Sequence, residues 1–221
     1  MRYNHILFDL DGTLTDPGVG ITKSVQYALR KLGIEKECDA LKSFIGPPLQ
    51  VSFRESCGFS EDQVTEAIAC YREYFSRQGI FENELYPLMK ESLETLIEAG
   101  CTLHVATSKP TVFAERILRH FDIQSCFTSV TGSGLDGTMS DKTEIIAHVL
   151  QEQKIAAANA VMIGDRKHDL IGASNNHVAS IGVAYGYGSV EELAACEPAA
   201  IVSSVEELVE WLLEPASKLV P

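Results

Sequence analysis

The chain has 221 residues, of which 45% are hydrophobic and 22% charged, a composition typical of a folded globular protein and not of a disordered one. Thirty-one acidic residues against 18 Lys and Arg give a formal charge of −13, which argues against nucleic-acid binding through a broad basic surface. No apolar run is long enough to span a membrane, and no signal peptide precedes the first expected strand. We therefore expect a cytoplasmic protein with no membrane partner.

The six cysteines are scattered along the chain and form no Cys-x-x-Cys pair. Without a secretory signal, reduced thiols are expected in place of disulfides. The simplest prediction is that the cysteines are small core residues, and a zinc site is not expected.

The first predicted element is a strand over residues 3–10, which contains the apolar run ILF of residues 6–8 and ends at two aspartates. From residue 19 to 79 the apolar residues recur at helical spacing. Gly33 provides a helix stop signal, and Ser60 with Gln63 has the spacing of a capping box. No strand is expected in this stretch, which is typical of a small helical domain.

After Pro87, predicted strands alternate with predicted helices. The strands are expected at residues 102–106, 127–130, 160–163, 179–183 and 200–202. The helices are expected at 88–100 and 111–121, after caps at Asp141 with Glu144 and at Ser189 with Glu192, and around Trp211. Such alternation predicts an α/β fold, a Rossmann-like and mainly parallel sheet with helices on both faces.

The first strand should belong to the same sheet, because the helical block that follows it offers no pairing partner. The helical block is therefore expected to be an insertion. We predict an α/β core of residues 1–15 and 84–221 and an inserted α-helical cap domain of residues 16–83, with hinges near residues 15–18 and 79–85.

Acidic residues follow two of the expected strands, at the sheet edge where open parallel sheets bind ligands. Asp9 and Asp11 are two residues apart in a nearly extended segment and should lean to the same side, and Gly12 permits the turn after them. Asp165 ends another strand, and Asp169 lies four residues further on. The alternative for an isolated pair is a turn with solvated acids. A cluster of all four is costly without a hard divalent cation, and oxygen ligands favour Mg²⁺ over zinc.

Carboxylates around Mg²⁺ with lysines nearby suit phosphoryl chemistry. Lys142 would neutralise phosphate oxygens, Thr107 can donate its hydroxyl, and the backbone N–H groups of Ser108 and Lys109 can form an anion nest. One Asp can act as a covalent nucleophile while a second serves as general acid and base. Because such chemistry must exclude water, the helical insertion is expected to act as a lid.

Four segments in order resemble the motifs of the haloacid dehalogenase superfamily: residues 8–16 (FDLDGTLTD), 105–110 (VATSKP), Lys142, and 163–169 (IGDRKHD). The resemblance covers essentially the whole chain, including a helical cap inserted after the first motif. It is closest to the phosphoglycolate phosphatase-like branch, which includes 5′-nucleotidase-like and pyrophosphatase-like members. Dehalogenases of this superfamily lack the second Asp of the first motif and need no metal, so Asp11 and Asp165 favour a phosphatase.

The resemblance implies a role for each motif residue. Asp9 is the nucleophile and Asp11 the general acid and base. Phosphate is bound by Thr107 and Lys142, with Ser108 beside them. The implied Mg²⁺ ligands are Asp9, the backbone carbonyl of Asp11, Asp165, and Asp169 as a further or water-mediated ligand.

Weaker signals leave alternatives open. Gly46 lies in a Pro-containing turn of the cap, where related caps carry a substrate-specificity loop; the alternative is a plain helix–helix connection. Lys23 and Arg54 are candidates to face the substrate from the cap, and the alternative is that both are solvated cations. Lys109 is either a phosphate neighbour or a surface charge. The Gly-rich residues 185–189 are expected to form a loop near the site.

The expected function is Mg²⁺-dependent hydrolysis of a small phosphorylated metabolite, such as phosphoglycolate or a nucleoside monophosphate, through a phosphorylated Asp9. One alternative is a phosphoryl-transfer isomerase of the β-phosphoglucomutase type, which uses the same motifs. Another is a non-catalytic phosphate-binding module, although such modules usually have broken motifs. Residues 140–143 (SDKT) depart from the Lys-Pro-x-Pro form common in phosphoglycolate phosphatases. The leaving group therefore stays open, as does the choice between monomer and homodimer.

Overall fold

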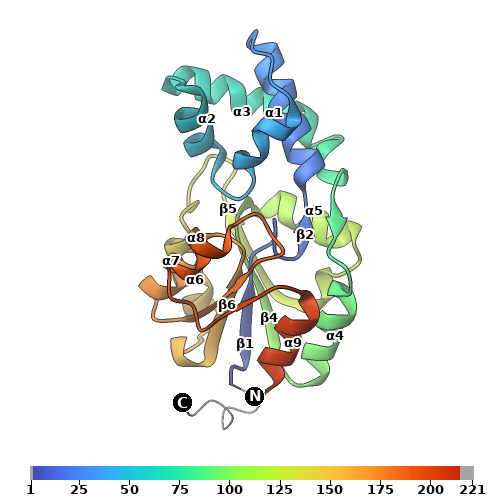
Figure 1. Ribbon diagram of the computed structural model, residues 1–221, viewed down its shortest axis with the longest axis vertical. Helices are drawn as coiled ribbons and strands as arrows, with labels where there is room; N and C mark the ends of the chain where they lie inside the picture. The colour runs from blue at the N-terminus through green and yellow to red at the C-terminus, as the bar shows by residue number, and fades with distance from the viewer. Residues whose placement is uncertain (1, 215–221) are drawn as a thin grey trace. The chain divides into compact units, whose positions relative to one another are not determined.

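The computed structural model describes residues 2–214, which divide into two compact units. Residues 2–14 and 85–214 form the core unit, which holds the large sheet, and residues 15–84 form the inserted unit, which is mainly helical (Figure 1). Two short strands, β2 (Thr15–Asp16) and β3 (Glu84–Leu85), pair where the chain passes between the units. Neither is predicted from the sequence, because two residues show no periodicity.

The core unit contains a six-stranded sheet with the order β5-β4-β1-β6-β7-β8, and every neighbouring pair is parallel. The first strand lies at the centre, where Leu7 is in register with His104 on one side and Met162 on the other. This confirms the Rossmann-like α/β core and the place of the first strand in it. The strands are β1 (His5–Phe8), β4 (Thr102–Pro110), β5 (Phe127–Ser133), β6 (Ala160–Gly164), β7 (Ala179–Val183) and β8 (Ala200–Val202).

Helices cover both faces of this sheet (Figure 1). One face carries α4 (Met89–Glu98), α5 (Thr111–His120) and α9 (Val205–Leu213), and the other carries α6 (Lys142–Glu152), α7 (Lys167–Asn175) and α8 (Val190–Ala194). The central strands are therefore buried on both sides. This explains why residues 6–8 and 161–163 are unbroken apolar runs and do not alternate with polar residues.

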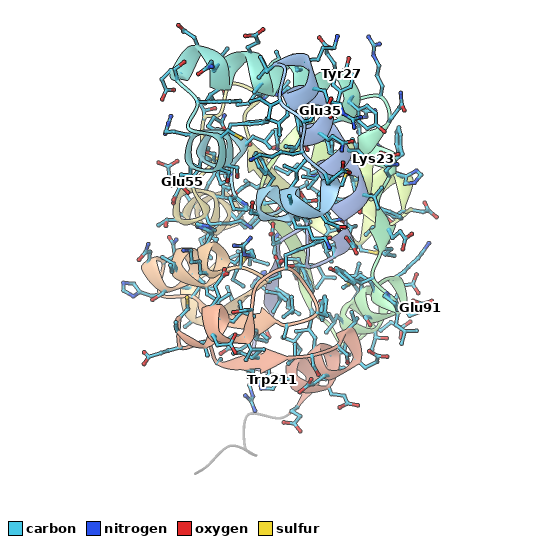
Figure 2. All side chains as sticks on the ribbon, turned by 45° about the horizontal axis from the view of Figure 1, so that its top comes forward. Lys23, Tyr27, Glu35, Glu55, Glu91 and Trp211 are labelled. Carbon is cyan, nitrogen blue, oxygen red and sulfur yellow. The ribbon has the colours of Figure 1, made fainter. Side chains whose placement is uncertain are left out.

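Trp211 fixes α9 near the start of the chain (Figure 2). Its ring is stacked on Tyr3 with 6.4 Å between the ring centroids, and the Arg2 guanidinium lies 4.5 Å from the centroid of the indole. Aromatic stacking and a cation–π contact thus join the last described helix to the residues before β1.

Capping explains where several helices begin, with one difference from the expectation. The Asp141 side chain accepts a hydrogen bond from the backbone N–H of Thr143 at the start of α6. Ser189 likewise accepts from the backbone N–H of Glu192 at the start of α8. The Glu192 carboxylate does not close a capping box; it contacts Arg166 and the backbone N–H of Lys167 instead. A tertiary contact has displaced the local one.

The inserted unit, residues 15–84, contains three α-helices. Helix α1 (Gly18–Lys31) ends before Gly33, whose φ is 77°. The next helices are α2 (Leu49–Cys57) and α3 (Glu61–Phe75), and short 3₁₀ helices lie at Cys38–Phe44 and Gly79–Phe81. The capping box predicted at Ser60 and Gln63 is present in both directions.

Phe53 anchors the core of the inserted unit. Its ring packs edge-on against Phe44 at 5.0 Å between centroids and stacks on Phe59 at 6.0 Å. Val25 and Leu29 of α1 are fully buried as well. The helical periodicity in the sequence therefore corresponds to an apolar face on each helix.

All six cysteines carry free thiols, but only Cys101 is buried. The prediction that the cysteines are core residues is therefore wrong for the other five, which lie at partly exposed positions. In residues 2–214, no helix combines the length and the apolar composition needed to cross a membrane.

Candidate active site

Three aspartates from two segments of the chain meet at the carboxyl edge of the sheet. Asp9 follows β1, and its backbone N–H donates to the carbonyl of Ile163 at 2.9 Å, which ties it to β6. Asp165 follows β6, and Asp169 lies in the first turn of α7. All three are buried, and one carboxylate oxygen of each lies within 4.8 Å of the other two. The sheet order thus brings residue 9 beside residues 165 and 169.

Lys142 lies among these carboxylates, as the first residue of α6. Its Nζ is 2.7 Å from Oδ1 of Asp9 and 2.6 Å from Oδ1 of Asp169, and it donates to the carbonyl of Ala106 at 2.8 Å. These contacts use the three N–H donors of an ammonium group. Burial opposes the charge of Lys142, but Asp169 and Asp9 outweigh it, so the pKa is raised.

The cluster carries more negative charge than Lys142 can balance. Burial, together with the charges of Asp169 and Asp9, raises the pKa of Asp165 well above its usual value. Burial raises the pKa of Asp169 to about 6 even though Lys142 favours its ionised form. Three ionised carboxylates beside one ammonium would leave two uncompensated negative charges in a buried site, which is unfavourable without a cation.

The donor atoms fit a hard divalent cation. Oδ2 of Asp165 accepts a hydrogen bond from the backbone N–H of Tyr187 at 2.8 Å, whereas its Oδ1 is buried with no hydrogen-bond partner among the described residues. A buried, unused carboxylate oxygen near the carboxylates of Asp9 and Asp169 is suited to coordinate Mg²⁺, which prefers oxygen ligands. The residues present therefore match the predicted ion.

Asp11 and Lys109 form a second buried pair at the same edge. Oδ2 of Asp11 lies 2.8 Å from Nζ of Lys109, and the two side chains are only 11% and 6% exposed. The interpretation of Lys109 as a surface charge is therefore wrong. Burial raises the pKa of Asp11, and Lys109 opposes that rise only in part. The Asp11 carboxylate is outside the three-aspartate cluster, and coordination through its backbone carbonyl stays a prediction.

Thr107 and Ser108 lie on the last part of β4, beside these charges. Thr107 is buried, and its Oγ1 accepts a hydrogen bond from the backbone N–H of Lys109 at 3.2 Å. The Ser108 hydroxyl donates to the carbonyl of Ser140 at 3.0 Å, which connects β4 to the loop before Lys142. A phosphate contact by either residue stays a prediction.

Two glycines allow the acidic segments to approach one another. Gly12 has a φ of 85°, and a Cβ at this position would lie 2.2 Å from Oδ2 of Asp165. A Cβ at Gly164 would lie 2.2 Å from Cβ of Asp169. Substituting either glycine would push a carboxylate out of the cluster.

The predicted cap residues have partners within the inserted unit. Lys23, which projects from α1 together with Tyr27 (Figure 2), is 2.6 Å from Oε1 of Glu82. Arg54 forms an ion pair with Glu61 at 2.5 Å. Gly46 has a left-handed backbone with a φ of 101°, consistent with a sharp turn. Contacts of Lys23, Arg54 and Gly46 with a substrate stay predictions.

Two groups that support the site are not predicted from the sequence in that role: the backbone N–H of Tyr187, and the Glu192 carboxylate, which is expected only to cap a helix. The N–H of Tyr187 donates to Asp165. The Glu192 carboxylate contacts Arg166 and the backbone N–H of Lys167, the two residues that follow Asp165. The Gly-rich composition of residues 185–188 indicates a loop, but local sequence does not say what the loop contacts. The structure alone shows that it lies against Asp165.

A parallel sheet whose edge brings together buried carboxylates and a lysine is typical of a phosphoryl-transfer enzyme. The family model of the haloacid dehalogenase-like hydrolases matches residues 6–183. The chain therefore belongs to the haloacid dehalogenase-like hydrolase family.

Known proteins resemble the chain over nearly its full length. A 5′-nucleotidase of Pseudomonas aeruginosa is 53% identical over 199 residues, which cover 90% of each chain. The tyrosine-protein kinase PtkA of Mycobacterium tuberculosis is 36% identical, with 94% of this chain and 72% of the relative covered. A phosphoglycolate phosphatase of Vibrio parahaemolyticus is 30% identical, with 93% and 94% covered.

A solved structure shows the same likeness in three dimensions. The crystal structure of a predicted phosphatase from Clostridium acetobutylicum has a TM-score of 0.94 and 47% identity, and covers 97% of this chain and 100% of its own. The predicted family is thus confirmed, and the chain is a phosphatase of that family.

Proposed function

We propose that this protein is a Mg²⁺-dependent phosphatase that hydrolyses a small phosphomonoester through a phosphorylated Asp9. The observation that carries the proposal is the buried cluster of Asp9, Asp165 and Asp169 beside Lys142, in which one Asp165 oxygen has no hydrogen-bond partner in residues 2–214. Mg²⁺ held by Asp9, Asp165, the Asp11 carbonyl and Asp169, directly or through water, would neutralise phosphate oxygens. Such a site would let an anionic nucleophile approach an anionic substrate.

In the first half of the reaction, an Asp9 carboxylate oxygen attacks phosphorus while the bond from phosphorus to the leaving oxygen breaks. Asp11 donates a proton to that oxygen, so the product leaves as an alcohol. The raised pKa of Asp11 favours the protonated form that this step requires. Lys142 holds the Asp9 carboxylate in place through the 2.7 Å ion pair.

In the second half, water attacks the phosphorus of phosphorylated Asp9. Asp11, now ionised, accepts a proton from that water, and the bond from phosphorus to the Asp9 oxygen breaks. Phosphate leaves, Asp9 is again a carboxylate, and Asp11 is protonated for the next cycle. One residue thus serves as acid and then as base.

We favour a 5′-nucleoside monophosphate as the substrate, ahead of phosphoglycolate. The support is the higher identity to the 5′-nucleotidase, 53% against 30% for the phosphoglycolate phosphatase. The proposed partner is therefore a small phosphorylated metabolite. As expected from the sequence, we propose that the protein acts in the cytoplasm.

The second candidate function is transfer of the phosphoryl group to a hydroxyl other than that of water. It is favoured by the 36% identity to a tyrosine-protein kinase, and it includes the isomerase alternative considered from the sequence. The same phosphorylated Asp9 would serve either acceptor, because only the second attacking oxygen differs.

The test is phosphate release from nucleoside monophosphates, phosphoglycolate, sugar phosphates, pyrophosphate and ATP, with and without Mg²⁺. We expect phosphate from a nucleoside monophosphate only with Mg²⁺. Asp9→Asn should lower kcat at least about 10³-fold, whereas Asp62→Asn, at an exposed position of α3, should leave it unchanged. Activity of Asp9→Asn near that of the wild type would refute the nucleophile. With a substrate whose transferable phosphoryl group carries ³²P, transfer of that group to a sugar or a tyrosine without phosphate release would favour the transferase.

A further inference from the structure

Residues 185–188 form a loop that contacts the candidate metal site through its backbone. The N–H of Tyr187 donates to Oδ2 of Asp165 at 2.8 Å. The other oxygen, Oδ1, is buried and has no hydrogen-bond partner among the described residues. Fixing one oxygen of a carboxylate also fixes the direction in which the other can bind a cation.

The loop lies so close to Asp165 that two of its positions accept only glycine. A Cβ at Gly186 would lie 2.3 Å from Cβ of Asp165 and 2.4 Å from the carbonyl oxygen of Gly12. A Cβ at Gly188 would lie 2.0 Å from the carbonyl oxygen of Asp165. The backbone of the two glycines is not left-handed, so space and not conformation requires them.

Tyr185 connects the same loop to the segment that follows Asp9 and Asp11. Its hydroxyl donates to the carbonyl of Thr13 at 3.1 Å, and its ring packs edge-on against Tyr86 with 4.8 Å between centroids. The loop thus contacts both segments that supply carboxylates to the site.

We propose that residues 185–188 are a positioning element for the metal site. They aim Oδ1 of Asp165 at the divalent cation. The loop touches no reacting atom. It acts through Asp165, whose carboxylate it holds from one side, while Gly186 also fits against the turn at Gly12. This inference rests on the proposed Mg²⁺-dependent function.

The test is the affinity for Mn²⁺ in the absence of substrate, measured by electron paramagnetic resonance of the free ion. Gly186→Ala should raise the Kd for Mn²⁺ at least about tenfold, the usual effect of disturbing a group that orients a metal ligand. Tyr185→Phe keeps the ring but removes the hydrogen bond to Thr13, and should raise the Kd about threefold. If Gly186→Ala does not fold, Tyr185→Phe carries the test.

The matched control is Gly20→Ala in the inserted unit. A Cβ there would lie 1.9 Å from the carbonyl oxygen of Gly79, so it should destabilise the fold as Gly186→Ala does while leaving the Kd for Mn²⁺ unchanged. At saturating Mg²⁺, kcat of Gly186→Ala should return to within about twofold of wild type, because the loop does no chemistry.

The outcomes separate this inference from the function on which it rests. If Gly186→Ala binds Mn²⁺ as the wild type does, the positioning role is refuted and the phosphatase proposal stands. If Gly20→Ala weakens Mn²⁺ binding equally, the effect is one of general stability and the inference is likewise refuted. If the wild type neither binds Mn²⁺ nor releases phosphate, both proposals fail.

Discussion

Lys142 shows how one buried cation can organise a site that is otherwise acidic. Its ammonium contacts Asp9 and Asp169 at 2.7 and 2.6 Å and is almost fully buried. Desolvation makes such a pair a weak source of stability, yet removing one partner is costly because a buried charge then stays unpaired. The geometry therefore predicts that Lys142 matters for stability, and its contact with phosphate stays a prediction.

Lys142→Met should lower the unfolding free energy at pH 7.5 by about 3 kcal/mol. The loss should shrink at pH 5, because the pKa values of carboxylates left without their counterion rise and protonation then stabilises the folded state. Urea denaturation at both pH values measures this. Lys90→Met, which removes a surface ion pair of 3.4 Å with Asp122, should change stability by at most about 0.5 kcal/mol. An equal loss in both variants would contradict the role of burial.

His104 makes the stability of the fold depend on pH independently of the candidate site. It is buried on β4, with Nδ1 at 2.8 Å from the Ser129 hydroxyl and Nε2 at 3.3 Å from Nδ1 of His5. Burial, and to a lesser extent the charge of His5, lowers its pKa from 6.5 to about 4. Between those pH values the unfolded chain binds a proton that the folded chain does not. The contribution of neutral His104 to the unfolding free energy is therefore fully present above about pH 6.5 and is lost as the pH falls from there toward about 4.

His104→Gln should accordingly flatten the fall in stability on acidification. From pH 7.5 to pH 5, the wild type should lose about 2 kcal/mol more unfolding free energy than the variant. The exposed His120→Gln is the control and should follow the wild-type curve. Parallel curves for His104→Gln and the wild type would contradict the assignment.

At the scale of elements, helix ends show which local signals persist in the folded chain. The box at Ser60 and Gln63 forms at an exposed helix start, where each side chain accepts a hydrogen bond from the backbone N–H of the other residue. At α8, Ser189 caps but Glu192 turns to Arg166 and Lys167, residues that lie 26 and 25 positions away in the chain. A charge-assisted contact with a guanidinium is stronger than a second capping bond.

Ser60→Ala should destabilise α3 by about 1 kcal/mol, the usual cost of losing an N-cap side chain. Hydrogen exchange of the first amides of α3 should accelerate by roughly fivefold, since each 1.4 kcal/mol corresponds to a factor of about ten. Ser43→Ala, at an exposed position of the inserted unit, should leave these rates unchanged. Unaltered exchange in Ser60→Ala would show that the box contributes nothing.

At the scale of the whole molecule, the sheet of the core unit holds several carboxylates close together although the chain already has a formal charge of −13. The sheet order places β1 between β4 and β6, so the residues after these strands meet at one edge. The folding of the core must overcome repulsion among Asp9, Asp165 and Asp169. A divalent cation would remove this repulsion and so couple metal binding to global stability.

Mg²⁺ should therefore raise the melting temperature of the metal-free protein. At about 100 times its Kd, the ion should add about 2.7 kcal/mol, which for a chain of this size corresponds to a rise of roughly 5 to 10 °C. Differential scanning calorimetry with and without Mg²⁺ measures the shift. Asp165→Asn should show little or none of it, and a full shift in that variant would refute Asp165 as a ligand.

The sequence alone was enough to predict the order of the six strands of the large sheet and of the helices around them, the helical character of the insertion, and the four acidic and basic segments. Each depends on local information: the period of apolar residues, the Gly and capping signals at element ends, and short motifs such as residues 8–16 and 163–169. Such signals need only a few neighbouring residues to be read.

The tertiary structure decided which charges face one another. The sheet buries Lys109 against Asp11 and places Lys142 between Asp9 and Asp169. A later loop brings the backbone N–H of Tyr187 to Asp165. Residues 9 and 169 are distant in the chain, and no local period relates them. Their contact exists only because β1 pairs with β6 in parallel.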